Sequence, residues 1–254
     1  RTHGNLPNWK LGVLYKPAAN GSVYVNFAQS QQPPGGNTLA FSSSANSLDR
    51  PNLDPEKART AEAGSKWDLL DGQLLLTGAL YRTTVSNELV QDATNPNEYY
   101  QVGKKRVQGV ELTAVGKLGD AWAISAGFTT MHASVVTGTN VSNDGSSDLA
   151  YTPRKAFTAW STYRLPSGFT LGGGARYAGE MKRGIDGAIG TPAYTEAYWV
   201  FDAMASYPVN RHFDVQLNAY NLFDKHYVAA INKSGYRYTP GTPRSAMITF
   251  NIRY

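Results

Sequence analysis

The side chains that could catalyse a reaction or hold a metal are scattered along this sequence. Its 254 residues include no cysteine, so neither a disulfide framework nor a thiolate metal site can form. The four histidines show no HxxxH or similar metal-binding spacing, and they are His3, His132, His212 and His226. A hydrolase would need a serine or aspartate beside a histidine. His132 and His226 lie near the ends of predicted strands, so a hydrolase remains an alternative.

Three short motifs have a possible ligand chemistry. The oxygens of residues 143–148 (NDGSSD) could bind calcium, but the segment lacks the ordered acids and terminal Glu of an EF-hand loop, and we interpret it as an outer loop. The glycines at 172–174 are followed by no helix, so they indicate close packing or a bend within a strand. The basic run 104–106 alternates between the two faces of a strand. This favours contact with a lumen or with lipopolysaccharide over a nucleic-acid patch.

The composition narrows the class of protein. No run of 18 apolar residues is present, which excludes a transmembrane helix. The mean hydropathy of −0.39 does not exclude a membrane barrel, because every second residue of a barrel strand is polar. The 25 Gly, 16 Tyr and 5 Trp are typical of an all-β protein with many turns. The net charge of +5 comes from dispersed Lys and Arg, so we expect no nucleic-acid partner.

Strands are the elements that must position any functional group. Alternating apolar and polar residues, interrupted by turn residues, predict eleven of them. Their approximate ranges are 8–16, 22–31, 59–67, 73–90, 99–116, 121–135, 154–164, 169–182, 194–207, 212–227 and 241–254.

The connections between these strands alternate in length. The short ones are 17–21, 68–72, 117–120, 165–168 and 208–211, and all carry Gly, Pro, Asn or Asp. The longer ones are 32–58, 92–98, 136–153, 183–193 and 228–240. Short turns on one side and long loops on the other are typical of an up-and-down outer-membrane barrel. The sequence therefore predicts an all-β fold, a transmembrane antiparallel β-barrel that makes residues 1–254 part of one domain.

Aromatic residues flank the short turns on the strand face that carries the apolar residues. In the final strand, Ala246, Ile248, Phe250 and Ile252 share one face with the terminal Tyr254. Such a level of aromatics predicts a periplasmic girdle at the membrane interface. Its predicted members are Tyr15, Trp67, Trp122, Tyr163, Phe169, Tyr207, Phe213 and Tyr254.

Charged residues fall on the opposite phase of the predicted strands. An Arg or Lys facing lipid at the midplane would cost about 2–4 kcal/mol, so we expect these charges to face inward. They are Glu62, Lys66, Arg82, Glu111, Arg176 and Asp202. The barrel interior is therefore predicted to be polar, and filled by water or by a plug.

The number of strands has a topological consequence. Eleven strands with alternating direction leave the first and the last parallel to each other, so they cannot close an antiparallel barrel. We therefore expect the sheet to need a further odd number of strands. The N-terminal segment 1–7 has no Met and no signal-peptide pattern, and it resembles the end of an outer loop.

Several motifs resemble the barrels of TonB-dependent outer-membrane siderophore receptors, and most closely those of ferric catecholate receptors. They are WKLGVLYKP at 9–17, PEK at 55–57, EAGSKW at 62–67, VGKKRVQGVE at 102–111, DAMASY at 202–207, NLFDKHY at 221–227 and PR at 243–244. The resemblance runs nearly end to end. It implies a 22-stranded barrel in the bacterial outer membrane, of which this chain forms eleven strands, with an N-terminal plug domain and TonB box absent from it.

The resemblance implies import of a ferric siderophore with energy from the TonB complex, and no enzymatic chemistry. The siderophore is the transported ligand, and no cofactor is bound directly. The implied partners are the siderophore, the TonB complex through the missing N-terminal region, the missing plug and barrel half, and the outer membrane with its lipopolysaccharide. A passive porin-like or structural barrel remains an alternative, as does the hydrolase.

A ferric tris-catecholate is a bulky aromatic anion, so its site should offer Arg or Lys for charge and Tyr or Trp for stacking. The candidates at outer strand ends and in loops are Arg50, Tyr99, Tyr100, Lys104, Lys182, Arg183, Tyr236, Arg237 and Tyr238. Residues 236–238 form the densest such cluster.

Overall fold

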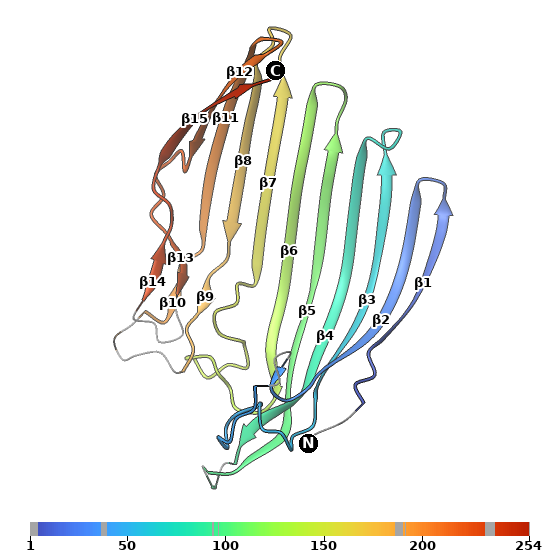
Figure 1. Cartoon of the computed structure of the whole chain (residues 1–254), viewed down its shortest axis with the longest axis vertical. Helices are drawn as coiled ribbons and strands as arrows, with labels where there is room; N and C mark the ends of the chain where they lie inside the picture. The colour runs from blue at the N-terminus through green and yellow to red at the C-terminus, as the bar shows by residue number, and fades with distance from the viewer. Residues whose placement is uncertain are drawn as a thin grey trace.

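A computed structural model shows the chain as one curved sheet with small hairpins at one end (Figure 1). The structure describes residues 5–36, 40–92, 94–95, 97–185, 190, 192–231 and 237–253. Within these ranges the regular elements are strands, and no helix is long and apolar enough to cross a membrane.

The main sheet has eleven strands, and each pairs antiparallel with its neighbour. In spatial order they are β1 (Trp9–Ala18), β2 (Gly21–Gln32), β3 (Glu56–Leu69), β4 (Leu74–Gln91), β5 (Tyr99–Lys117), β6 (Trp122–Thr137), β7 (Lys155–Arg164), β8 (Thr170–Ala178), β11 (Tyr198–Asn210), β12 (Phe213–Tyr220) and β15 (Ser245–Ile252). Two hairpins stand apart from this sheet: β9 (Met181–Lys182) with β10 (Tyr194–Thr195), and β13 (Val228–Ile231) with β14 (Tyr238–Pro240).

The predicted eleven-stranded antiparallel sheet is confirmed, and so is the sorting of its connections. Short turns lie at one end of the sheet and the longer connections lie at the other (Figure 1). Four predicted strands are too long, and one of them, predicted over 241–254, is observed only over Ser245–Ile252. The strand predicted over 169–182 stops at Ala178, and that over 194–207 is interrupted at residues 196–197. The strand predicted over 212–227 stops at Tyr220, because Asn221 has a φ of 50° and turns the chain.

The register divides the side chains of the sheet into two faces, because directly paired residues point the same way. On one face, here called the apolar face, lie large exposed residues such as Leu80, Leu112 and Ile248. The other, the polar face, carries Glu62 and Lys66. Because both faces of this single layer are uncovered, few apolar residues are buried among the described residues; they are Leu74, Ala133 and Val200.

The predicted face is confirmed for Glu62, Lys66, Glu111, Arg176 and Asp202 but is wrong for Arg82. Arg82 pairs with Ala61 and Gln108, and its neighbour Leu80 pairs with Ala63 and Val110. It therefore lies on the apolar face, toward the end with the long connections. Residues 74–81 are apolar on both phases, so alternation alone could not identify the outward phase.

The aromatic residues near the short turns lie on the apolar face. Trp122 pairs with Tyr163, and both side chains are exposed. The rings of Phe169 and Tyr207 are 4.6 Å apart. The remaining described members of the predicted girdle are Tyr15, which is exposed, Trp67, which pairs with Gly21, and Phe213, whose ring stacks on that of Phe250. Tyr254 lies outside the described residues, and contact of this girdle with lipid stays a prediction.

The glycines at 172–174 accommodate a tryptophan on the polar face. A Cβ added to Gly174 would lie 2.4 Å from Cε3 of Trp160, so the indole ring needs the missing side chain. The interpretation of these glycines as a site of close packing is confirmed for Gly172 and Gly174, whereas a Cβ added to Gly173 would have 3.9 Å of space.

Candidate functional site: an aromatic and basic cavity

The two small hairpins lie toward the end of the sheet that carries the long connections (Figure 1). Residues of both hairpins and of the segments beside them line a cavity. Its volume is about 860 Å³, within the range of roughly 300–1,000 Å³ found for sites that bind small molecules. The charged and aromatic residues of its lining are Arg183, Tyr194, Glu196, Tyr198, Lys225, His226, Tyr227 and Tyr238. Tyr198 pairs with Ala178 and shares its phase with Asp202, so the cavity opens from the polar face.

Asn221 holds the base of the second hairpin. Only 2% of its surface is exposed. Its Nδ2 donates to the carbonyl oxygens of Lys225 (2.9 Å) and Thr242 (3.0 Å), and its Oδ1 accepts from the Lys225 amide (2.8 Å). The Asn221 amide itself donates to Oδ1 of Asp202 on β11 (2.8 Å). The side chain therefore joins the two ends of the segment that carries β13 and β14, and the backbone amide fixes that segment to β11.

A pair of tyrosines forms one wall of the cavity. The rings of Tyr198 and Tyr227 have centroids 4.2 Å apart and are tilted by 33°. Such a pair contributes about 0.5–1.5 kcal/mol beyond the area that it buries. The Tyr227 ring lies directly over Gly241, where an added Cβ would come within 2.1 Å of its Cε1. The absence of a side chain at Gly241 therefore allows the ring to take this position.

The first hairpin is held from its other side by the connection between β6 and β7. The Asn143 amide donates to the Arg183 carbonyl (2.9 Å), and the Tyr151 amide donates to the Lys182 carbonyl (2.8 Å). On the opposite edge, the Arg183 amide donates to the carbonyl of Ala193, the residue before β10 (2.8 Å). The segment that carries Arg183 is thus paired on both edges, which fixes its backbone at the rim of the cavity.

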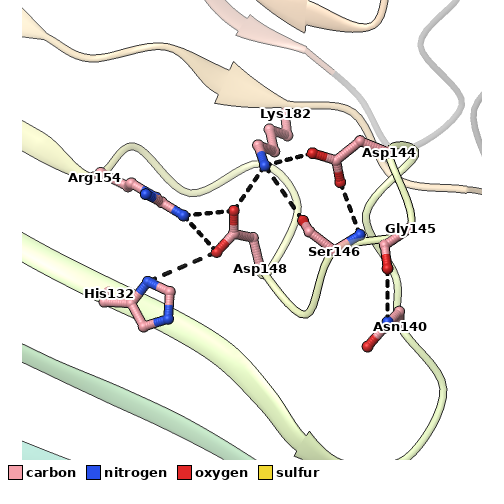
Figure 2. Close-up of polar contacts among 8 residues, drawn as sticks. All are labelled: His132, Asn140, Asp144, Gly145, Ser146, Asp148, Arg154 and Lys182. Carbon is pink, nitrogen blue, oxygen red and sulfur yellow. Dashed lines mark hydrogen bonds and ion pairs between the residues drawn. The ribbon is translucent and has the colours of Figure 1, made fainter.

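An ionic network also joins the connection between β6 and β7 to Lys182 of the first hairpin (Figure 2). Nζ of Lys182 donates to Oδ2 of Asp144 (2.5 Å) and to Oδ2 of Asp148 (2.7 Å). Both oxygens of Asp148 also accept from Nη2 of Arg154 at 2.7 Å, and Nδ1 of His132 lies 3.7 Å from Oδ1. The hydrogen bond from Lys182 lowers the pKa of Asp148, and Arg154 lowers it further. Asp144, which Lys182 also binds, has a strongly lowered pKa.

The chemistry of the cavity suits a planar, negatively charged ligand. Four tyrosine rings can stack on or contact an aromatic group, and the cations of Arg183 and Lys225 can offset negative charge. Glu196 is the acid of the lining.

The structure separates the predicted binding residues into two groups. Arg183 and Tyr238 line the cavity, Arg237 precedes Tyr238 in the chain and is exposed, and Lys182 belongs to the ionic network. Tyr236 lies outside the described residues.

The second group lies near β4 and β5. Tyr99 begins β5 and pairs with Gln91, whereas the Tyr100 hydroxyl donates to Glu98 (2.8 Å). Nη1 of Arg50 lies 3.4 Å from the Ala45 carbonyl. Lys104 pairs with Ser86, on the phase of the apolar face. No described contact joins this group to the cavity. A role in ligand binding stays a prediction for both groups.

Sequence reasoning did not select Tyr194, Tyr198, Lys225, His226 or Tyr227 as ligand candidates. Residues 225–227 stood in a motif that resembled a family pattern, and they were predicted to lie in a strand. Two features together could have found them: each is a Tyr or a basic residue beside a predicted long connection, and the adjoining strand shows which phase is polar.

Comparison with protein families matches residues 1–222 to the family described as TonB dependent receptor-like, beta-barrel. The chain is 53% identical over 253 residues to the catecholate siderophore receptor Fiu of Escherichia coli K12, covering 99% of this chain and 33% of that protein. It is 34% identical over 265 residues to the probable TonB-dependent siderophore receptor PiuA of Acinetobacter baumannii, covering 100% of this chain and 35% of that protein. The chain thus spans about a third of the length of these relatives.

Solved structures of the same two proteins have the same fold. The closed form of the ferric-catecholate import receptor Fiu from E. coli K12 superposes with a TM-score of 0.93 at 52% identity, covering 97% of this chain and 35% of that one. The siderophore receptor PiuA from A. baumannii superposes with a TM-score of 0.82 at 33% identity, covering 97% and 36%.

Proposed function

Because the chain belongs to the TonB-dependent receptor β-barrel family, we propose that it forms eleven strands of an outer-membrane receptor that imports a ferric siderophore of the catecholate type. The similarity to the catecholate receptor Fiu over nearly the whole chain carries this proposal. The tyrosines and cations of the cavity support it, because a ferric tris-catecholate presents aromatic rings and negative charge.

In this receptor the apolar face lies against the lipid and the polar face lines the lumen. The unpaired edges of β1 and β15 pair with strands beyond this chain, in a barrel of 22. A plug domain, also beyond this chain, fills the lumen and responds to the TonB complex. The long connections lie outside the cell, so the cavity belongs to an outer vestibule where the siderophore is first held. The cargo undergoes no covalent change, and iron travels as part of it.

A receptor is favoured over the alternatives of a hydrolase and a passive barrel. The relatives described above are named as receptors. A cavity with four tyrosines and the two cations Arg183 and Lys225 also provides more selective chemistry than a passive pore requires.

The test uses the full-length receptor in a strain that lacks other siderophore receptors, grown under iron limitation. Catecholate chelates should restore growth, and hydroxamate chelates should not. Equal rescue by both chelates, or rescue by neither, would refute the catecholate assignment.

The cavity is tested separately with purified receptor and a ferric tris-catecholate. Arg183→Gln should weaken binding about 10- to 100-fold, the range expected for the loss of a hydrogen bond from a charged group. Arg211→Gln removes the same charge at a short turn and should leave the affinity unchanged. Equal affinities of the two variants would exclude this cavity as the siderophore site.

A further inference from the structure

Asp202 of β11 lies at the point where the chain leaves the main sheet and enters the cavity wall. β12 ends at Tyr220, and the chain turns at Asn221, whose φ is 50°. Two amides still join the departing chain to β11. The Leu222 amide donates to the Phe201 carbonyl (2.8 Å), and the Asn221 amide donates to Oδ1 of Asp202 (2.8 Å). The Asp202 side chain thus takes the place of a backbone acceptor.

One wall of the cavity depends on this attachment. The described part of the segment from Asn221 to Thr242 lines the cavity with Lys225, His226, Tyr227 and Tyr238. Its strands, β13 and β14, pair with each other and not with the main sheet. The Asn221 side chain donates to the carbonyl oxygens of Lys225 and Thr242, near the two ends of the segment. A shift of Asn221 would therefore move this wall relative to Tyr198 on β11.

Arg176 holds the other oxygen of the same carboxylate. Its Nη2 lies 3.5 Å from Oδ2 of Asp202. Arg176 belongs to β8 and Asn221 follows β12, so the carboxylate is held from both sides of β11. The Arg176 side chain is 55% exposed, so the ion pair contributes less than the hydrogen bond to the Asn221 amide. The guanidinium group fixes the rotation of the carboxylate, with Oδ1 toward that amide.

The main sheet makes no use of the Asp202 side chain. The backbone of Asp202 pairs with Gly174 on β8, a contact that any residue could make. Aspartate is unfavourable within strands, and the Asp202 side chain is only 16% exposed. Within the described part of the chain, its carboxylate contacts the Asn221 amide and Arg176. A carboxylate at this position therefore serves the cavity wall.

We propose that Asp202 is a positioning residue for siderophore binding. Its carboxylate holds the Asn221 amide, and thereby keeps the wall that carries Tyr227 in the place where the ligand is bound. Arg176 acts one step further away, by orienting that carboxylate. Neither Asp202 nor Arg176 is part of the cavity lining, so both act through other residues. The assignment rests on the proposed function, since it takes this cavity as the siderophore site.

The experiment uses the purified full-length receptor and measures the Kd of a ferric tris-catecholate and the hydrogen exchange of residues 222–231. Asp202→Ala removes the acceptor of the Asn221 amide. Asp202→Asn keeps a side-chain oxygen that can accept from this amide but loses the charge. Asp214→Ala is the matched control, because Asp214 is 18% exposed, lies 3.0 Å from Arg253 and stands beside a short turn.

Asp202→Ala should raise the Kd about tenfold, the low end of the effect of losing a hydrogen bond to a charged group, and should speed exchange by a similar factor. Asp202→Asn should raise the Kd only about threefold, because a charge-assisted hydrogen bond is roughly twice as strong as a neutral one. Asp214→Ala should change neither measurement. An unchanged Kd in Asp202→Ala, an equal loss in Asp214→Ala, or an equal loss in Asp202→Asn would overturn the proposal.

Arg176→Gln tests the orienting step. Alone it should raise the Kd about twofold, as expected for a mostly exposed ion pair. Combined with Asp202→Asn it should add nothing, because the charge of the pair is already lost. A further loss in the combined variant would indicate direct contact between Arg176 and the ligand, and would overturn the orienting role.

Two further arms keep the outcome interpretable. If Asp202→Ala does not fold, Asp202→Val takes its place, since valine favours strands and offers no acceptor. Failure of the unmodified receptor to bind the ferric tris-catecholate would refute the cargo assignment. Hydrogen exchange without ligand would then decide whether Asp202 holds the wall: faster exchange in Asp202→Ala would support this role, and equal rates would overturn it.

Discussion

Replacing Gly241 with alanine should displace one wall of the cavity without changing its charge. The new Cβ would lie 2.1 Å from Cε1 and 2.2 Å from Cζ of Tyr227. Carbon atoms pack best at about 3.5–4.0 Å, so the ring must move by about 1.5 Å. The hydrogen bond from the Gly241 amide to the Tyr227 carbonyl, 2.8 Å long, can remain because it involves backbone only.

A movement of this size would disrupt the stacked pair of Tyr227 and Tyr198, whose centroids are 4.2 Å apart. An aromatic pair contributes about 0.5–1.5 kcal/mol, and losing that contribution as a ligand contact corresponds to about a two- to tenfold rise in Kd. The eleven-stranded sheet should keep its stability, because Gly241 lies outside every strand of it.

The assay is titration of the purified full-length receptor with a ferric tris-catecholate, with circular dichroism to check the barrel. Gly127→Ala is the matched control, since its added Cβ would meet Thr158 at an ordinary 3.8 Å. Gly127 also lies on the polar phase, opposite Thr113. An unchanged Kd in the Gly241 variant, or an equal change in both variants, would refute the role of this tyrosine pair in binding.

Three further changes test the supports of the site. Asp148→Asn should speed hydrogen exchange of the Leu149 amide about fivefold or more at pH 7, because residue 148 loses its charge-assisted hydrogen bonds. Arg154 is mostly exposed, so we expect an effect at the low end of the range for hydrogen bonds to charged groups. Asn221→Ala should lower the free energy of unfolding of the segment that carries β13 and β14 by about 1–3 kcal/mol, measured by hydrogen exchange, because buried backbone groups lose their partner. Gly174→Ala should destabilise the barrel by about 1–3 kcal/mol in urea unfolding, because its Cβ overlaps the indole ring.

Each of these changes has a matched control. Asp120→Asn removes one carboxylate at a short turn and should leave exchange at Leu149 unaltered. Asn20→Ala removes an exposed hydrogen bond of 3.0 Å and should have a smaller effect than the change at Asn221. Gly173→Ala should be tolerated, since its Cβ has 3.9 Å of space. An effect in any control as large as in its test variant would contradict the assigned contact.

The Asp148 prediction includes a pH dependence. Lys182, followed by Arg154, lowers the pKa of Asp148 below its ordinary value of 3.8. The contribution of this carboxylate to loop stability is therefore complete above that value and is lost as the pH falls through the lower folded pKa. Exchange rates of the unmodified and Asp148→Asn proteins should converge in strongly acidic solution. A difference that persists there would show that charge is not the cause.

The fold could be predicted from the sequence because each strand of the main sheet has one apolar side and one polar side. A single layer with an apolar and a polar side gives strict alternation, and this holds for Glu62, Lys66 and Glu111. The prediction failed where alternation was lost. Around Leu75 and Leu80 both phases are apolar, so the direction of Arg82 depended on pairing with β3 and β5.

The candidate site could be predicted only in part, because it depends on contacts between distant segments. Arg183 and Tyr238 were selected by residue type, and they line the same cavity because two hairpins with little alternation of their own lie beside it. The turn at Asn221 requires a positive φ, which asparagine tolerates better than most residues. The residues around Asn221 also fit the alternating pattern of the preceding strand, so the pattern alone does not reveal the turn. The hydrogen bond from Asn221 to Thr242 identifies the turn, and a contact 21 residues away leaves no local pattern.

Charge pairing distinguishes the two sides of the sheet and supports their separate roles. On the polar face, Arg176 lies 3.5 Å from Asp202, and Arg253 lies 3.0 Å from Asp214. Each of these two guanidinium groups therefore has a carboxylate beside it. On the apolar face, the hydrogen bonds that Arg59 and Arg82 make with described residues go to the side-chain amides of Gln29 and Gln108. Within the described residues the guanidinium groups of the two faces therefore have different partners, which are carboxylates on the polar face and side-chain amides on the apolar face.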